Sequence, residues 1–119
     1  MIYHKYGKCA IKAYELVLNN VEPREAWQKA ANEIFGNNSS QAKKTCPRTS
    51  FLALLGANKK VTKNVEYVLK GLSIMNKMDI DELNYMEPSQ FWRNKLGMID
   101  KKYNSQIDVL FALRSKNYI

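Results

Sequence analysis

The apolar residues of this chain recur at the spacing of amphipathic α-helices, and no segment shows the convincing alternation typical of a strand. The clearest helix lies between Pro23, which suits a first helical turn, and Gly36, which suits a helix stop. Its apolar positions follow the i, i+3, i+4, i+7, i+8 spacing, and they are Trp27, Ala30, Ala31, Ile34 and Phe35. The pattern therefore predicts an all-α fold in which this helix faces the core.

Similar patterns over the rest of the chain predict a compact, single-domain bundle of six or seven short helices. After a polar loop from Asn37 to Ser40, Ser39 or Ser40 can cap a short turn that runs through Lys44. The other helices are expected over about residues 6–19, from Pro47 to about Leu55, from the cap residue Thr62 to Met75, from Asp79 towards Tyr85, from Pro88 to Gly97, and from Ser105 onward.

Three of these segments also predict which side chains are buried. The final helix is densely apolar from Ile107 to Leu113, so we expect it to lie at the centre of the core. A short ribbon between Met98 and Tyr103 is an alternative that the pattern leaves open. The inward positions of the other two helices are Val65, Val68, Leu69, Leu72 and Met75 in one, and Phe91, Trp92 and Leu96 in the other.

The length of 119 residues suits one domain, residues 1–119, with a single core. The longest uncharged stretch, Thr49 to Asn58, is about half of the roughly 20 residues that span a bilayer. Met1 to Lys12 contains scattered lysines and no apolar segment of signal-peptide length. We therefore expect a cytoplasmic protein without membrane contact, in which Cys9 and Cys46 are reduced thiols.

The positive charge of the chain is concentrated in its middle. Of a net charge of +8, seven units fall between Ser40 and Lys77, where Glu66 is the single acid. A focused basic surface attracts polyanions, so these residues predict a nucleic-acid-binding surface. The candidate contact residues are Lys43, Lys44, Arg48, Thr49, Lys59, Lys60, Lys63, Tyr67 and Lys70.

Two parts of this basic segment have a specific rationale. From Lys43 to Ser50, cations and hydroxyls surround a predicted helix start, whose free N–H groups favour phosphate. The alternative is a solvated helix start whose lysines only keep the protein soluble. Lys63 and Tyr67 combine a cation with an aromatic ring, which suits a nucleic-acid backbone and an exposed base. The alternative there is an ordinary polar helix face in which Glu66 pairs with Lys70.

Other chemistry receives less support from the sequence. Cys46 could be a reactive thiol, because a helix start and nearby cations lower a cysteine pKa, but the single histidine, His4, lies near the amino terminus, where we expect the chain to fray. Cys9 lies on an apolar helix side and is expected in the core. The spacing of cysteines and histidine does not form a ligand set, so we expect no metal, no cofactor and no catalytic residue. A helix-turn-helix fits poorly because Pro47 and a long polar connection interrupt it.

The segment from Lys43 to Leu55, KKTCPRTSFLALL, resembles a family of small bacterial proteins of unknown function. Members of that family show a lysine, Cys-Pro, a basic residue and Phe-Leu in a similar order. The resemblance implies a stand-alone domain and no particular chemistry. It extends to Tyr6-Gly7, PREAW from Pro23, KNVEYVLKGL from Lys63 and NSQIDVLFALRSKNYI from Asn104.

Three functions are consistent with the sequence. The first is a non-catalytic nucleic-acid-binding module that contacts phosphates through the basic segment. The second is a protein-binding adaptor or inhibitor, such as those of mobile elements, that docks on an acidic partner. The third, and least supported, is a thiol-dependent enzyme that uses Cys46.

Overall fold

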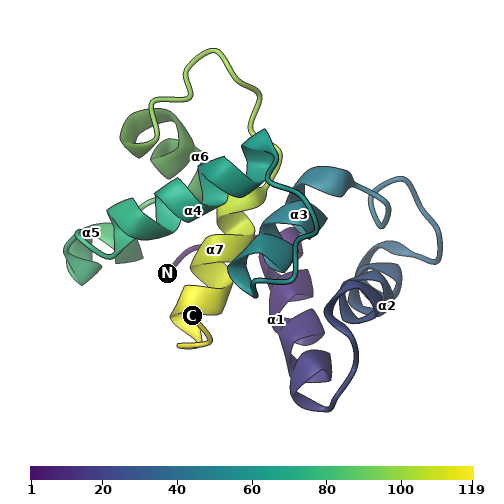
Figure 1. The fold of residues 1–119 in the computed structure, drawn as a ribbon. Helices are drawn as coiled ribbons and strands as arrows, with labels where there is room; N and C mark the ends of the chain where they lie inside the picture. The colour runs from purple at the N-terminus through teal and green to yellow at the C-terminus, as the bar shows by residue number, and fades with distance from the viewer.

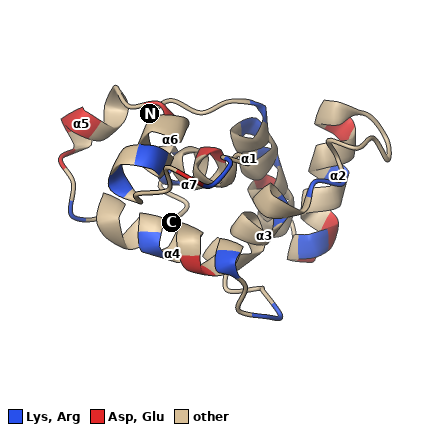
Figure 2. Ribbon diagram, turned by 90° about the horizontal axis from the view of Figure 1, so that it is seen from above, with Lys and Arg blue, Asp and Glu red and all other residues tan.

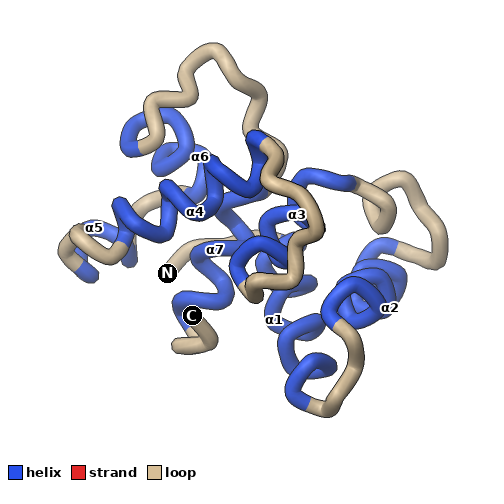
Figure 3. The backbone as a smooth tube through the Cα atoms, in the orientation of Figure 1, coloured by secondary structure: helices blue, strands red, loops and turns tan.

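Helices account for all the regular structure of this chain, as the computed structural model, which describes all 119 residues, contains no strand (Figure 3). Seven α-helices and one π-helical turn form an all-α globule, so the predicted fold class is confirmed. None of them combines the length and apolar character needed to cross a lipid bilayer. In chain order (Figure 1) they are α1 (Lys5–Leu18), α2 (Pro23–Phe35), α3 (Thr45–Leu54), α4 (Lys63–Met75), α5 (Ile80–Asn84), α6 (Pro88–Gln90), the π-helical turn η1 (Phe91–Lys95) and α7 (Gln106–Ser115).

Most helix ends follow from local residue chemistry. At the start of α2, Pro23 stands in the first turn and the Glu22 carboxylate accepts hydrogen bonds from two backbone N–H groups. Thr62 caps α4, as predicted, by accepting a hydrogen bond from the Val65 N–H at 3.4 Å. Gly36 and Gly56 end α2 and α3 with φ values of 100° and 70°, which an L-residue with a side chain rarely adopts.

Three predicted starts and caps need correction. The third helix begins at Thr45 rather than at Pro47, because a proline in the first turn removes an N–H that has no partner in the helix anyway. Asp79 caps α5 through the Asp81 N–H at 3.0 Å, without the predicted reciprocal bond from Glu82. Ser105 precedes α7 but makes no capping bond, because its backbone is left-handed with φ of 66°.

Helix α7 lies at the centre of the molecule, as its sequence predicts. Every residue from Gln106 to Leu113 is buried, and the helix packs against α1, α3, α4 and α6. Two groups of buried side chains meet on it. One group joins α1, α2 and α3 through Val109 and Leu113, and the other joins α4 and the α6–η1 segment through Ile107, Leu110 and Phe111. Figure 1 shows α7 between α1 and α4.

Helix α4 crosses α7 at a glycine, and this crossing changes the predicted buried stripe. Val65, Val68 and Met75 are buried as expected, but Leu69 is 43% exposed. Gly71 is buried instead, where an added Cβ would lie 3.2 Å from a Leu110 methyl group. Because a glycine lets the two helices approach closely, the contact centres on Gly71 and leaves Leu69 at its edge.

The segment after α6 contains a π-helical turn, a feature often found at functional sites. The turn is closed by the Leu96 N–H, which donates to the Phe91 carbonyl oxygen at 3.1 Å, and Phe91 and Trp92 are both buried. The Trp92 indole N–H donates to the Lys101 carbonyl oxygen at 3.0 Å. This bond fixes the connection from Leu96 to Ser105 as an irregular loop, and the alternative of a short ribbon there is not formed.

Candidate functional site

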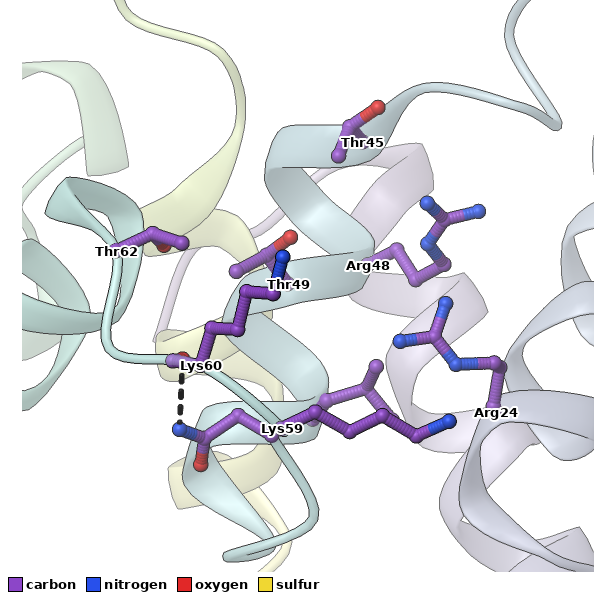
Figure 4. A pocket seen from close by; sticks show the side chains of 9 residues that line it. Arg24, Thr45, Arg48, Thr49, Lys59, Lys60 and Thr62 are labelled. Atoms are coloured by element: carbon purple, nitrogen blue, oxygen red, sulfur yellow. Dashed lines mark hydrogen bonds between the residues drawn. The ribbon is translucent and has the colours of Figure 1, made fainter.

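Two arginines are brought together by the contact between α2 and α3. The rings of Trp27 and Phe51 pack with their centroids 5.2 Å apart, and both side chains are buried. Arg24 precedes Trp27 by three residues, and Arg48 precedes Phe51 by three residues. Since three residues are close to one helical turn, each arginine lies on the same side of its helix as the buried ring. Both arginines also stand in the first turn of their helices. Figure 4 shows that the two guanidinium groups point into the same space.

The connection between α3 and α4 closes this space from the other side. After the turn at Gly56, the Ala57 N–H donates to the Leu52 carbonyl oxygen at 2.8 Å. The Asn58 side-chain amide donates to the Lys60 carbonyl oxygen at 3.1 Å, which fixes the turn that carries the lysines (Figure 4). The resulting hollow, called the first depression below, has a volume of about 410 Å³. Its charged and hydroxyl-bearing lining residues are Arg24, Arg48, Lys59, Lys60, Thr45, Thr49 and Thr62.

The cations of the first depression form no ion pair. The four ion pairs of the molecule are His4–Glu87, Lys12–Glu33, Lys29–Glu25 and Lys95–Glu82, and none involves a lining residue. Glu22 is a nearby carboxylate, whose pKa is lowered mainly by the backbone N–H groups of Arg24 and Glu25 and further by the charges of Arg24 and Lys59. The four cations that line the depression outnumber this one capping carboxylate, so the net charge of this region is positive.

A second depression lies where α4 begins, beside η1 and the loop that follows it. Its volume is about 280 Å³. The half-buried ring of Tyr67 meets the buried ring of Trp92 edge-on, with centroids 5.4 Å apart and planes at 86°. Like the first depression, it contains no acidic residue among those that line it. The lining residues are Lys63, Asn64, Tyr67, Trp92, Lys101, Lys102, Asn104 and Gln106.

The basic candidates predicted from the sequence divide between these two places and the open surface. Arg48, Thr49, Lys59 and Lys60 line the first depression, and Lys63 and Tyr67 line the second. Figure 2 shows basic positions along the α3–α4 connection and on α4. The remaining three candidates, Lys43, Lys44 and Lys70, line neither depression.

The structure gives these three lysines different surroundings. The ammonium group of Lys44 lies 5.5 Å from the centre of the Tyr6 ring, a cation–π contact that directs it towards α1. Lys43 and Lys70 are exposed, and Lys70 forms no ion pair with Glu66. The alternative of a paired polar face on α4 is therefore not what the structure contains.

Sequence reasoning missed several residues that line the two depressions. Arg24 could have been found from the sequence, because it stands about one turn before Trp27, an apolar position of the helix predicted from Pro23. Lys101 and Lys102 lie in a loop whose path depends on the hydrogen bond from Trp92, and no local sequence pattern predicts that path. The lining residues outside the predicted contact set are Arg24, Thr45, Leu52, Asn58, Thr62, Asn64, Trp92, Lys101, Lys102, Asn104 and Gln106.

The two thiols have different environments. Cys9 is fully buried, and burial raises its pKa to about 12, which keeps the thiol protonated at neutral pH. Cys46 is half-buried in the first turn of α3, and its Sγ accepts a hydrogen bond from the Asn64 side-chain amide at 3.4 Å. No three His, Cys, Asp or Glu side chains lie together in a way that could hold a metal ion.

A family model matches residues 3–119, so the chain belongs to the family of unknown function DUF6979. The match covers almost the whole chain and includes both depressions. Comparison with curated proteins and with solved structures finds no match.

Proposed function

We propose that this member of a family of unknown function is a non-catalytic nucleic-acid-binding module whose first depression holds backbone phosphates. The observation that carries the proposal is the convergence of four unpaired cations, Arg24, Arg48, Lys59 and Lys60, from two helices and one loop around a single hollow. Phosphate is an anion that such a hollow suits, because arginine binds phosphate oxygens through two parallel hydrogen bonds.

The local charge balance supports an anionic ligand. Like charges that share a hollow repel one another, and an anion bound between them removes this repulsion. The hydroxyls of Thr45, Thr49 and Thr62 add neutral donors of the kind that contact phosphate oxygens in nucleic-acid complexes. The group is therefore suited to the phosphodiester backbone rather than to a particular base.

The extent of the positive surface favours a polymer over a single phosphate. Lys63, Lys101 and Lys102 line the second depression, and Lys43 and Lys70 are exposed outside both hollows. A helix-turn-helix reading of bases receives no support, since the connection from Gly36 to Lys44 is too long for that motif. We therefore propose binding that depends on phosphates and little on base sequence.

Fluorescence anisotropy with labelled single strands and duplexes of DNA and RNA tests this proposal over a range of salt concentrations. Affinity should fall steeply as salt rises, because each neutralised phosphate contributes about 0.7 to 0.9 to the slope of log K against log salt. The double variant Arg24→Gln/Arg48→Gln should bind more weakly and lower this slope by about 1.4 to 1.8.

A matched control removes the same amount of charge elsewhere. Lys12 and Lys29 are paired with Glu33 and Glu25 and line neither depression, so Lys12→Gln/Lys29→Gln should keep near-native affinity and slope. Glu22→Gln should bind a few-fold more tightly, because it removes a negative charge beside Arg24 and Lys59. Absence of binding at low salt, or binding insensitive to salt, would overturn the proposal and favour a docking role on an acidic protein.

A further inference from the structure

The two depressions adjoin at the first turn of α4. Thr62, the cap of this helix, lines the first depression, and the next two residues, Lys63 and Asn64, line the second. The surface therefore has two hollows separated by a single helical turn. Their unpaired cations are Arg24, Arg48, Lys59, Lys60, Lys63, Lys101 and Lys102.

A chain of hydrogen bonds holds the second depression in a fixed shape. The Asn104 N–H donates to Gln106 Oε1 at 2.8 Å, and Gln106 Nε2 donates to Asn64 Oδ1 at 3.1 Å. Asn64 Nδ2 in turn donates to Sγ of Cys46, the residue beside Thr45 in the wall of the first depression. These bonds connect the loop after η1 with α7, α4 and α3, so the two hollows share one wall.

Two aromatic residues, Tyr67 and Trp92, line this hollow. Trp92 is 1% exposed, holds the loop through the Lys101 carbonyl oxygen and packs nearly perpendicular to the ring of Tyr67. Tyr67 is half-buried and lines the hollow together with the three lysines Lys63, Lys101 and Lys102. A positively charged groove with an aromatic ring in it is the arrangement by which proteins bind single strands without sequence preference.

Asn64 and Gln106 each use the oxygen and the nitrogen of the side-chain amide within the hydrogen-bond chain, which holds both side chains in place. The lysine charges and the Tyr67 ring are the features of this hollow that suit a nucleic-acid strand. A duplex hides its base faces within the stack, whereas a single strand exposes them. A ligand that uses both hollows therefore has phosphates in the first and an unstacked base in the second.

From this arrangement we infer that the chain binds single-stranded nucleic acid, with the strand crossing the first turn of α4 and one base stacked on Tyr67 in the second depression. The inference rests on the proposed function and names its ligand class. Lys101 and Lys102 contact phosphates on the far side of that base. The Tyr67 ring stacks on an unpaired base of a single strand, whereas the bases of a duplex have no free face for this contact.

Anisotropy titrations with labelled oligothymidine, oligouridine and a duplex of equal length test the inference. The unmodified protein should bind both single strands more tightly than the duplex at the same salt concentration. Tyr67→Leu should weaken single-strand binding by roughly 5- to 100-fold, the usual effect of losing one stacked base, while leaving duplex affinity and the salt slope unchanged. Tyr67→Phe, which keeps the ring, should retain affinity, and Lys101→Gln/Lys102→Gln should lower the single-strand slope by about 1.4.

A second measurement uses the unmodified protein, so it does not depend on how the variants fold. Irradiation of a bound strand that contains 5-iodouridine should cross-link the peptide that includes Tyr67, as identified by mass spectrometry. Cross-links elsewhere, with equal single-strand affinities for Tyr67→Leu and Tyr67→Phe, would overturn the base site. The phosphate site would still stand if Arg24→Gln/Arg48→Gln weakened binding, whereas failure of the unmodified protein to bind any strand or duplex would refute both proposals.

Discussion

At the scale of single residues, Asp108 has the most demanding environment. It is 2% exposed, and its carboxylate accepts hydrogen bonds from the Tyr103 hydroxyl and from the His4 backbone N–H, the latter at 2.7 Å. Burial, together with the negative charge of Asp108, raises the pKa of Tyr103, so its hydroxyl stays protonated as a donor. Asp108 thus ties the amino-terminal segment and the loop after η1 to the central helix.

Replacing this carboxylate should destabilise the fold. In Asp108→Ala, the buried Tyr103 hydroxyl and the His4 N–H lose their acceptor, so the free energy of unfolding should fall by about 2 to 3 kcal/mol. Urea denaturation measures this change. The exposed loop variant Asp100→Ala is the control and should stay within about 0.5 kcal/mol of the original protein. Equal urea midpoints for the two variants would contradict the assigned role of Asp108.

His4 should make stability depend on pH near neutrality. Its pKa is raised, mainly by the hydrogen bond of its ring to the Glu87 carboxylate at 2.8 Å. The stabilisation is therefore fully present below the unfolded pKa of about 6.5 and is lost as pH rises through the folded value. Because the pair is largely exposed, the loss should not exceed about 1 kcal/mol.

Nuclear magnetic resonance titration gives the pKa of His4 directly, since it is the single histidine of the chain. Urea denaturation across the same pH range should show the loss of stability in the original protein and a flatter profile in His4→Gln. A measured pKa at or below the value of a model peptide would show that the contact with Glu87 does not form in solution.

At the scale of elements, several helix ends and most buried positions follow from the sequence, but the exposure of Leu69 does not. The ends at Pro23, Gly36 and Thr62 depend on local backbone chemistry, which a short stretch of sequence contains. The exposure of Leu69 depends on how closely α4 approaches α7 at Gly71. The separation of these two helices is set by side chains from other parts of the chain, such as Leu110 and Phe91. Long-range packing explains why a correctly predicted helix had one residue of its buried stripe misassigned.

The α4–α7 crossing should not tolerate a larger residue at Gly71. A side chain there would press on Leu110, Ile107 and Phe91, so Gly71→Val should lower the free energy of unfolding by about 1 to 3 kcal/mol through overpacking. Thermal denaturation followed by circular dichroism measures the effect. Ser73→Val places the same side chain at an exposed site of the same helix and should change stability much less. A similar melting temperature for both variants would argue against a close crossing.

At the scale of the whole molecule, the distribution of charge was only partly predictable. Residues near one another in sequence, such as Arg48, Lys59 and Lys60, meet because α3 and α4 are joined by a short connection. Arg24 joins them from outside the basic segment, through the contact of two buried aromatic rings. Lys44 lies outside the group, because its ammonium group contacts the ring of Tyr6 in α1. The charge pattern of the sequence thus predicted which part of the chain is basic, whereas helix packing determines which cations line the first depression.

Repulsion among the unpaired cations should make the melting temperature of the free protein rise with salt concentration. Salt screens repulsion between exposed charges, with a Debye length of about 10 Å at 0.1 M, so the melting temperature should rise with sodium chloride in the absence of ligand. Differential scanning calorimetry gives this dependence. In Arg24→Gln/Arg48→Gln the rise should be smaller than in Lys12→Gln/Lys29→Gln, whose lost charges were paired. A melting temperature that falls with salt would contradict net repulsion.

The central position of α7 has a consequence for how a cell makes this protein. A ribosome synthesises α1 to α6 before the segment around which they pack. At usual elongation rates of about 5 to 20 residues per second, α1 waits roughly 5 to 20 s for its neighbour α7 to emerge. Until then, rings such as those of Trp27, Phe51 and Phe91 lack part of their apolar surroundings. The core of this domain is therefore completed only after α7 has been translated.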